Sequence, residues 1–162
     1  METLALNQSI APSSLESDCF REFMAEIYAL VSGRAGQRDW LGTEKLYHPN
    51  ARFVRINDRR QMLGQKFEND GDGADASMCV MNLAEYIKNV SPVFLNYNFQ
   101  EQETFHVAHS QGASATIQSG YTARLWNDEE DRSWSGINFV HLVKQNDAWR
   151  MLNMVWDANF HS

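Results

Sequence analysis

The sequence contains few cysteines and no long hydrophobic run. Its two cysteines, Cys19 and Cys79, are too few for a disulfide framework, which favours a reduced, cytoplasmic setting. No apolar stretch approaches the roughly 18 residues that a membrane-spanning helix needs. The first residues also lack the basic start and apolar core of a signal peptide. We therefore expect a protein of the cytoplasm with no membrane partner.

Basic residues are also scarce, with 14 against 21 acidic residues and a net charge of −7. This charge would repel a phosphate backbone, so we expect no nucleic-acid partner. Apolar residues, in contrast, are abundant: 43% of the 162 residues are hydrophobic and 12% are aromatic. A chain of this length can bury about 70% of its unfolded surface in one core. With no repeat or linker to divide it, we predict a loose arm over 1–12 and one domain over 13–162.

Apolar spacing predicts helices in the first half of the chain. Ser13 and Glu16 have the spacing of a capping box, and apolar residues follow at three- and four-residue steps. A second helix is predicted after Asp39 and must end before Pro49, because proline disfavours helical geometry in the preceding residue. In all, three helices are predicted, over about 13–31, 39–47 and 82–90.

The rest of the chain alternates as β-strands do. A short strand is predicted at 51–56, and four long strands over about 96–109, 113–127, 133–145 and 148–158. Because strands of ten or more residues exceed the usual five or six, the sheet should be strongly curved. Three helices followed by a mainly antiparallel meander predict an α+β fold.

The last two predicted strands are apolar on both faces. One face can cover the helices, but a sheet with one solvated face should alternate between apolar and polar residues. The second apolar face therefore needs a partner, and a second copy of the chain is the simplest candidate. We expect a homodimer through the outer face of the sheet.

Two segments resemble a known family. RDWLGTEKLYHPNARFVRI (38–56), followed by a helix and long strands ending in NDAWRMLNMVWD (146–157), is similar to the nuclear transport factor 2-like superfamily. This superfamily includes ketosteroid isomerase, scytalone dehydratase and small polyketide cyclases. The resemblance implies a cystatin-like cone, in which a curved sheet wraps around the first helix and leaves a pocket. It also implies dimers through the outer face of the sheet.

The resemblance argues against isomerase chemistry. Isomerase-like members carry a carboxylate base on the strand after the second helix, and the matching position falls near Arg55. An arginine stays charged and cannot accept a proton from carbon. Arg55 could instead bind a ligand carboxylate or phosphate, or it could be an exposed arginine at a sheet edge.

Dehydratase-like members use tyrosines, histidines and an asparagine around the pocket. The residues that this comparison implies as catalytic are Tyr47, Asn138 and His141. Because Asn138 and His141 lie three apart on one strand, at most one of them faces the pocket. His141 could equally be a buried histidine at the dimer interface. We expect Tyr28, Arg55, Tyr121 and Trp156 to bind the ligand, and a tryptophan such as Trp156 could also simply fill the core.

No motif indicates a metal or cofactor site. His106 and His109 are three apart, which places them on opposite faces of a strand, whereas a shared metal needs one face. The acidic loop at 68–73 partly resembles a calcium loop, but its closing position is Cys79 and not glutamate. We expect neither a metal nor a cofactor.

Two functions from different classes follow. The first is a protein that binds a small, largely apolar cyclic compound in the cone, with or without dehydratase-, cyclase- or isomerase-like activity. The second is a non-catalytic dimerisation or protein-binding module. Convergent polar groups in the cone would favour the first, and a cone filled by methionine and tryptophan the second.

Overall fold

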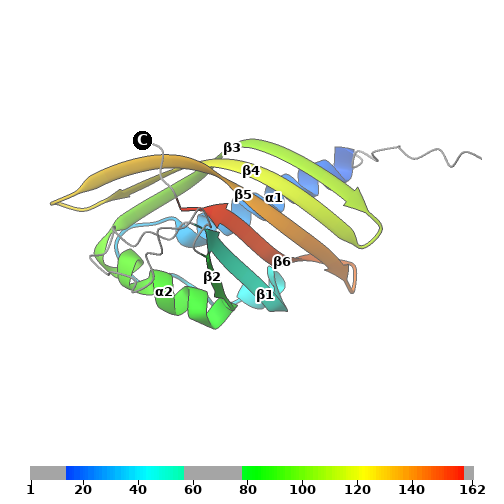
Figure 1. Cartoon of the computed structure of the whole chain (residues 1–162), viewed down its shortest axis with the longest axis horizontal. Coiled ribbons are helices and arrows are strands. Elements are labelled where there is room, and N and C mark those ends of the chain that lie inside the picture. The colour runs from blue at the N-terminus through cyan, green and yellow to red at the C-terminus, as the bar shows by residue number, and fades with distance from the viewer. Residues whose placement is uncertain (1–13, 57–77, 159–162) are drawn as a thin grey trace, which may run out of the picture.

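A computed structural model describes residues 14–56 and 78–158 (Figure 1). The predicted arm at 1–12, the capping residue Ser13 and the acidic loop at 68–73 lie outside the described residues. The elements are, in chain order, α1 (Ser14–Val31), the 3-10 helix η1 (Thr43–Lys45), β1 (Tyr47–Ile56), β2 (Met78–Met81), α2 (Leu83–Asn96), β3 (Asn98–Gln111), β4 (Ser114–Trp126), β5 (Asp131–Gln145) and β6 (Ala148–Asp157).

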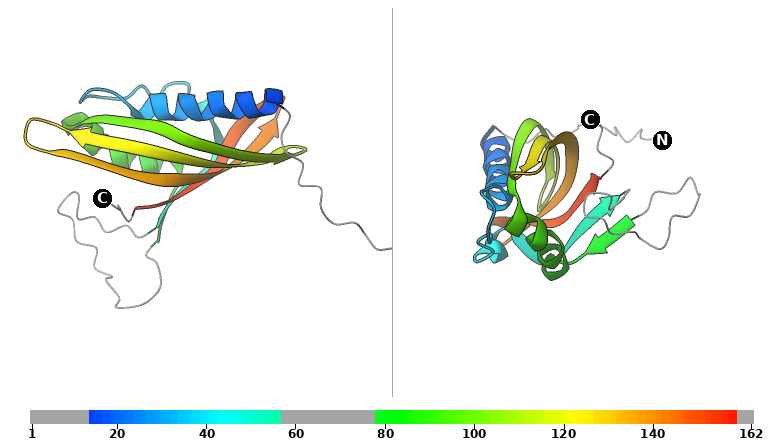
Figure 2. Two further views of the ribbon diagram at one scale, coloured as in Figure 1. Left: turned by 90° about the horizontal axis from the view of Figure 1, so that it is seen from above. Right: turned by 90° about the vertical axis from the view of Figure 1, so that its left-hand side faces the viewer.

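One curved sheet organises the molecule. Its strand order is β2-β1-β6-β5-β4-β3, and every neighbouring pair is antiparallel except β1 and β6, which are parallel. Figure 2 shows the long strands bending together, with α1 lying along one face of the sheet. The predicted α+β cone with a mainly antiparallel sheet is confirmed.

The prediction of three helices is wrong, because the described chain has two α-helices. Only the short helix η1 forms where the helix over 39–47 was expected. Gly42 there adopts a left-handed conformation with φ 82°, which a continuous right-handed helix does not contain, so the chain turns at this glycine. Tyr47 instead begins β1, with its side chain in the core.

Helix α2 begins as predicted but ends later. Asn82 and Glu85 form both hydrogen bonds of a capping box. The helix then continues through Pro92 to Asn96. Buried Phe94 stacks on Trp40 with ring centroids 6.5 Å apart, and this packing holds the turn beyond the proline.

A bulge in β6 changes which side chains face the core. Asn153 pairs with His141 and Met151 pairs with Leu142, so Leu152 is an extra residue. As a result, Met151 and Met154 are both buried although they are three apart. Strict alternation along a strand would place them on opposite faces.

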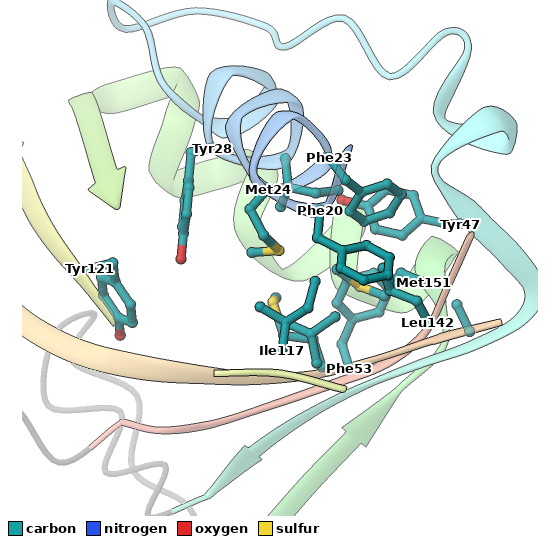
Figure 3. Close-up of a cluster of buried hydrophobic side chains, with 14 of the residues drawn as sticks. Phe20, Phe23, Met24, Tyr28, Tyr47, Phe53, Ile117, Tyr121, Leu142 and Met151 are labelled. Carbon is teal, nitrogen blue, oxygen red and sulfur yellow. The ribbon is translucent and has the colours of Figure 1, made fainter. Parts of the chain in front are cut away.

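Apolar side chains fill one part of the cone (Figure 3). The residues of α1 that face the sheet pack on buried residues of the strands, and the largest of these side chains are Phe20, Met24, Phe53, Ile117, Leu142 and Met151. Tyr28 and Tyr121 belong to the same cluster and lie at one end of it in Figure 3. In the described part of the chain, no helix has the length and apolar character needed to cross a membrane.

Candidate functional site

A cavity of about 170 Å³ lies between α2 and the concave face of the sheet. Its walls are mostly apolar, with Tyr86, Val90, Val93 and Phe94 from α2 and Phe99, Leu125, Trp134, Met154 and Trp156 from the strands. Four polar residues also line it: Arg55, Glu101, Tyr121 and Asn138. An apolar cavity on the order of 150 Å³ holds a benzene molecule. The volume therefore suits a compound with one ring.

Strand pairing brings distant residues to this cavity. Ser119 pairs with Asn138, Asn138 with Trp156, and Trp156 with Arg55, so the four form one row across β4, β5, β6 and β1. Paired residues share a face of the sheet, and this row lies on the concave side. The Arg55 guanidinium reaches α2, where both terminal nitrogens donate to the Asn89 side-chain oxygen at 3.4 and 3.3 Å.

Glu101, which the sequence analysis did not select, provides a carboxyl group inside the cavity. Burial raises its pKa from the ordinary value of 4.5 to about 7, while a hydrogen bond from the Asn138 amide partly opposes this rise. Its backbone is fixed to α1, because Ser32 Oγ accepts from the Glu101 N–H at 3.0 Å. The alternation of residues along β3 could have predicted this position, since Phe99, Glu101 and Glu103 all face inward.

Tyr121 lines the cavity, and its hydroxyl group lies against Gly136. Gly136 pairs with Tyr121, and a Cβ at position 136 would lie 2.6 Å from the tyrosine hydroxyl. The Trp134 side chain hydrogen-bonds Tyr121. Since an indole can only donate, the hydroxyl oxygen accepts this bond and keeps its own proton for another acceptor.

Four buried tyrosines near Glu101, of which Tyr86 and Tyr121 line the cavity, are neutral donors at physiological pH. Burial raises the pKa of Tyr28, Tyr47, Tyr86 and Tyr121 above the usual value of 10.0. Among these groups, Glu101 is therefore the one that changes charge near neutral pH.

The structure brings together most, but not all, of the residues selected from the sequence. Asn138, Arg55, Tyr121 and Trp156 line the cavity, and the Asn138 amide donates to the Tyr28 hydroxyl at 3.2 Å. Tyr47 lies in the core, with its ring centroid 5.3 Å from that of Phe53, and does not line the cavity.

His141 lies on the opposite face of the sheet from Asn138. It is exposed on the outer surface, where its Nδ1 is 3.1 Å from the Asn153 side-chain oxygen. Burial alternates strictly along this part of β5, so Asn138 points into the cone and His141 points away. The structure thus does not bring His141 to the cavity.

The two histidines of β3 are likewise separated. His106 faces inward and His109 is exposed. Residues 14–56 and 78–158 contain no group of three or more histidine, cysteine or acidic side chains placed to hold a metal ion.

Comparison with known proteins identifies the fold. No protein-family model matches the sequence, and no curated protein matches it either. Solved structures do match. A protein from Kribbella flavida is 14% identical over 93% of this chain and 95% of that chain, with a TM-score of 0.66. A nuclear transport factor 2-like protein from Salmonella enterica is 11% identical over 90% of this chain and 92% of that chain, with a TM-score of 0.63.

A third similar structure is a naphthalene 1,2-dioxygenase with indole bound in its active site. It is 9% identical over 94% of this chain and 82% of that chain, with a TM-score of 0.65. Identities this low identify the fold and not the activity. The chain therefore has the nuclear transport factor 2-like, cystatin-like fold, which confirms the resemblance predicted from the sequence at the level of fold.

Proposed function

We propose that this protein binds a small, largely apolar compound with one ring, and that Glu101 exchanges a proton with that compound. The observation that carries the proposal is the Glu101 carboxyl group, which lies inside a mostly apolar cavity with a pKa of about 7. A group with this pKa is present in both charge states at neutral pH, as a general acid or base requires.

The surrounding groups suit acid–base chemistry. The ionised Glu101 carboxylate can accept a proton from the ligand and return it at another atom. The Tyr121 hydroxyl can donate to an oxygen of the ligand on which negative charge develops. Such an arrangement supports dehydratase-, cyclase- or isomerase-like activity on a small ring.

This proposal changes the chemistry expected from the sequence. Arg55 stands where isomerase-like relatives carry their base, so the sequence indicated a pocket of neutral groups and a histidine. Glu101 supplies a carboxylate from a different strand. We still expect no isomerisation of a steroid, because the cavity of about 170 Å³ is smaller than the roughly 300–1,000 Å³ typical of sites for larger ligands.

Ligand-observed NMR with phenol, benzoate and cyclohexanone tests the proposal. We expect at least one of these compounds to bind wild-type protein with an affinity that changes with pH around a midpoint near 7. Glu101→Gln should abolish this pH dependence, and Val90→Trp, which fills the cavity from α2, should abolish binding. The matched control is Glu44→Gln at an exposed position, which should leave both properties unchanged. Binding by the Val90→Trp protein equal to that of wild type would contradict the proposal.

A second proposal concerns the outer face of the sheet. Large apolar side chains are exposed there on β3 and β5, namely Phe105, Val107, Ile137 and Phe139, with exposed fractions between 36 and 48%. Pairing through Gly120 and Gln118 of β4 joins them into one patch. Such a patch supports the expected homodimer, and it is also what a protein-binding module would need.

A further inference from the structure

A line of hydrogen bonds leads away from the cavity to a buried pair of side chains, Glu103 and His106. The Asn138 amide donates to the Tyr28 hydroxyl at 3.2 Å, and the Tyr28 and Ser119 hydroxyls are 2.7 Å apart. Ser119 in turn donates to Glu103, whose carboxylate lies 3.1 Å from His106 Nδ1. Four elements, α1, β3, β4 and β5, contribute these five side chains.

A bulge in β3 makes this arrangement possible. The pairing of β3 with β4 shifts between Glu103 and Phe105, so Thr104 is an extra residue. Glu103 and His106 consequently face the same side although they are three apart. The His106 side chain is only 1% exposed.

The hydrogen bonds of the histidine define its tautomer. His106 Nε2 is buried and has no hydrogen-bond partner among the described residues. A buried N–H without a partner is rarer in proteins than a buried acceptor without one. We therefore place a proton on Nδ1, which donates it to Glu103.

The donor and the acceptor of each hydrogen bond in the line can now be assigned. Ser119 has a single proton, which it donates to Glu103, so its oxygen accepts from Tyr28. The Tyr28 oxygen then accepts from the Asn138 amide. The amide nitrogen of Asn138 must consequently face Tyr28, and this same nitrogen hydrogen-bonds the Glu101 carboxylate.

We infer that Glu103 is a positioning residue for Glu101, acting through Ser119 and Tyr28 to hold the Asn138 amide with its N–H groups toward the cavity carboxylate. The inference rests on the proposed role of Glu101. When Ser119 no longer accepts the Tyr28 proton, the hydroxyl of Tyr28 can donate to Asn138 instead. The amide then turns its oxygen toward Tyr28, and Glu101 loses its donor.

Several titratable and charged side chains lie near Glu101. The tyrosines that face it are Tyr28 of α1, Tyr47 of β1, Tyr86 of α2 and Tyr121 of β4, and burial raises the pKa of each. The charged side chains are Arg55 of β1 in the same cavity, Glu103 of β3, and Asp157 of β6, which acts on Tyr121. The Glu101→Gln variant, which lacks only this carboxyl group, therefore identifies the resonance of Glu101.

The test is a pH titration of the Glu101 carboxyl carbon by NMR, with ¹³C-labelled glutamate and assignment by Glu101→Gln. In Ser119→Ala, which changes no charge, we expect the midpoint to rise by about one pH unit, since the charged form loses a hydrogen bond. Glu103→Leu should give a smaller rise, because it removes the acceptor of Ser119 but also a negative charge near Glu101. Glu103→Gln keeps an acceptor for Ser119 and removes a negative charge, so its midpoint should stay or fall.

The matched control is Ser110→Ala. Ser110 also lies on the inner face of β3 and donates to a carboxylate of α1, Glu16, at 3.2 Å, but it is outside the line. Its midpoint should equal that of wild type. A midpoint that is unchanged or lower in Ser119→Ala would overturn the inference. A wild-type midpoint near 4.5 would instead overturn the proposed role of Glu101, so the two failures are distinguishable.

Discussion

Replacing Glu101 with glutamine should stabilise the protein at alkaline pH and have little effect at acidic pH. Glutamine has nearly the same shape as glutamate, keeps an oxygen that can accept from Asn138, and carries no charge. The cost of burying a negative charge is therefore removed while the packing is retained.

The size of the effect follows from the pKa of Glu101. Burial raises this pKa from 4.5 in the unfolded chain to about 7 in the folded protein, a difference of about 2.5 units. Between these values the folded protein holds a proton that the unfolded chain has lost, so the free energy of unfolding falls as pH rises. The loss is complete above about pH 7, and at about 1.4 kcal/mol per unit it amounts to about 3 kcal/mol.

Urea denaturation at one-unit steps from pH 4 to pH 9 measures this difference. We expect the unfolding free energies of wild type and Glu101→Gln to agree near pH 4 and to differ by about 3 kcal/mol at pH 8, with the variant more stable. Glu44→Gln, at an exposed position, should follow the wild-type curve at every pH. Two parallel curves for wild type and Glu101→Gln would refute the reasoning.

Three further predictions test the site, the outer face and the expected lack of metal. Asn138→Ala should weaken binding of any one-ring probe that the NMR screen identifies, whereas His141→Ala on the opposite face of the same strand should not; isothermal titration calorimetry compares the two. Phe139→Asp should give particles near the chain mass of 18.6 kDa in analytical ultracentrifugation, while wild type sediments as a dimer; a monomeric wild type would refute the dimer. EDTA should leave the thermal unfolding midpoint unchanged, because the described residues hold no metal-binding group, and a clear fall would disprove this expectation.

Much of the fold can be predicted from the sequence because its signals are local. Alternation along the long strands and the apolar spacing of the helix that begins at 82 each depend on a few neighbouring residues, and both predictions agree with the structure. The helix expected over 39–47 does not form because Gly42 turns the chain in a left-handed conformation and Tyr47 begins a strand. The bulges at Thr104 and Leu152 have no signature in the sequence, yet each reverses the alternation beyond it.

The candidate site could be predicted only in part, because some of its residues are brought together by pairing and bulges that local sequence patterns do not show. Asn138 and Arg55 follow from alternation and from the family resemblance, and both line the cavity. The resemblance directed the search for a base to the strand at 51–56, so the carboxylate of Glu101 on another strand was not considered. The pairing of Glu103 with His106 depends on the bulge, and strict alternation would place them on opposite faces.

The bulge in β3 also affects how the molecule meets other chains. In the described sheet, β3 is an outermost strand of 14 residues. Phe99 on its edge pairs with Gly33 and the Glu101 N–H donates to Ser32, so the part beyond Glu101 is the edge that no described strand covers. A straight strand of that length would be a template for the strands of unfolded or neighbouring chains, and so for aggregation. An extra residue at Thr104 interrupts the regular spacing of those groups and increases the local twist. A strand of another chain can then pair with the edge on one side of the bulge but not along its whole length. The extra residue Thr104, which places Glu103 and His106 on one face, therefore also protects the protein from aggregating through this edge.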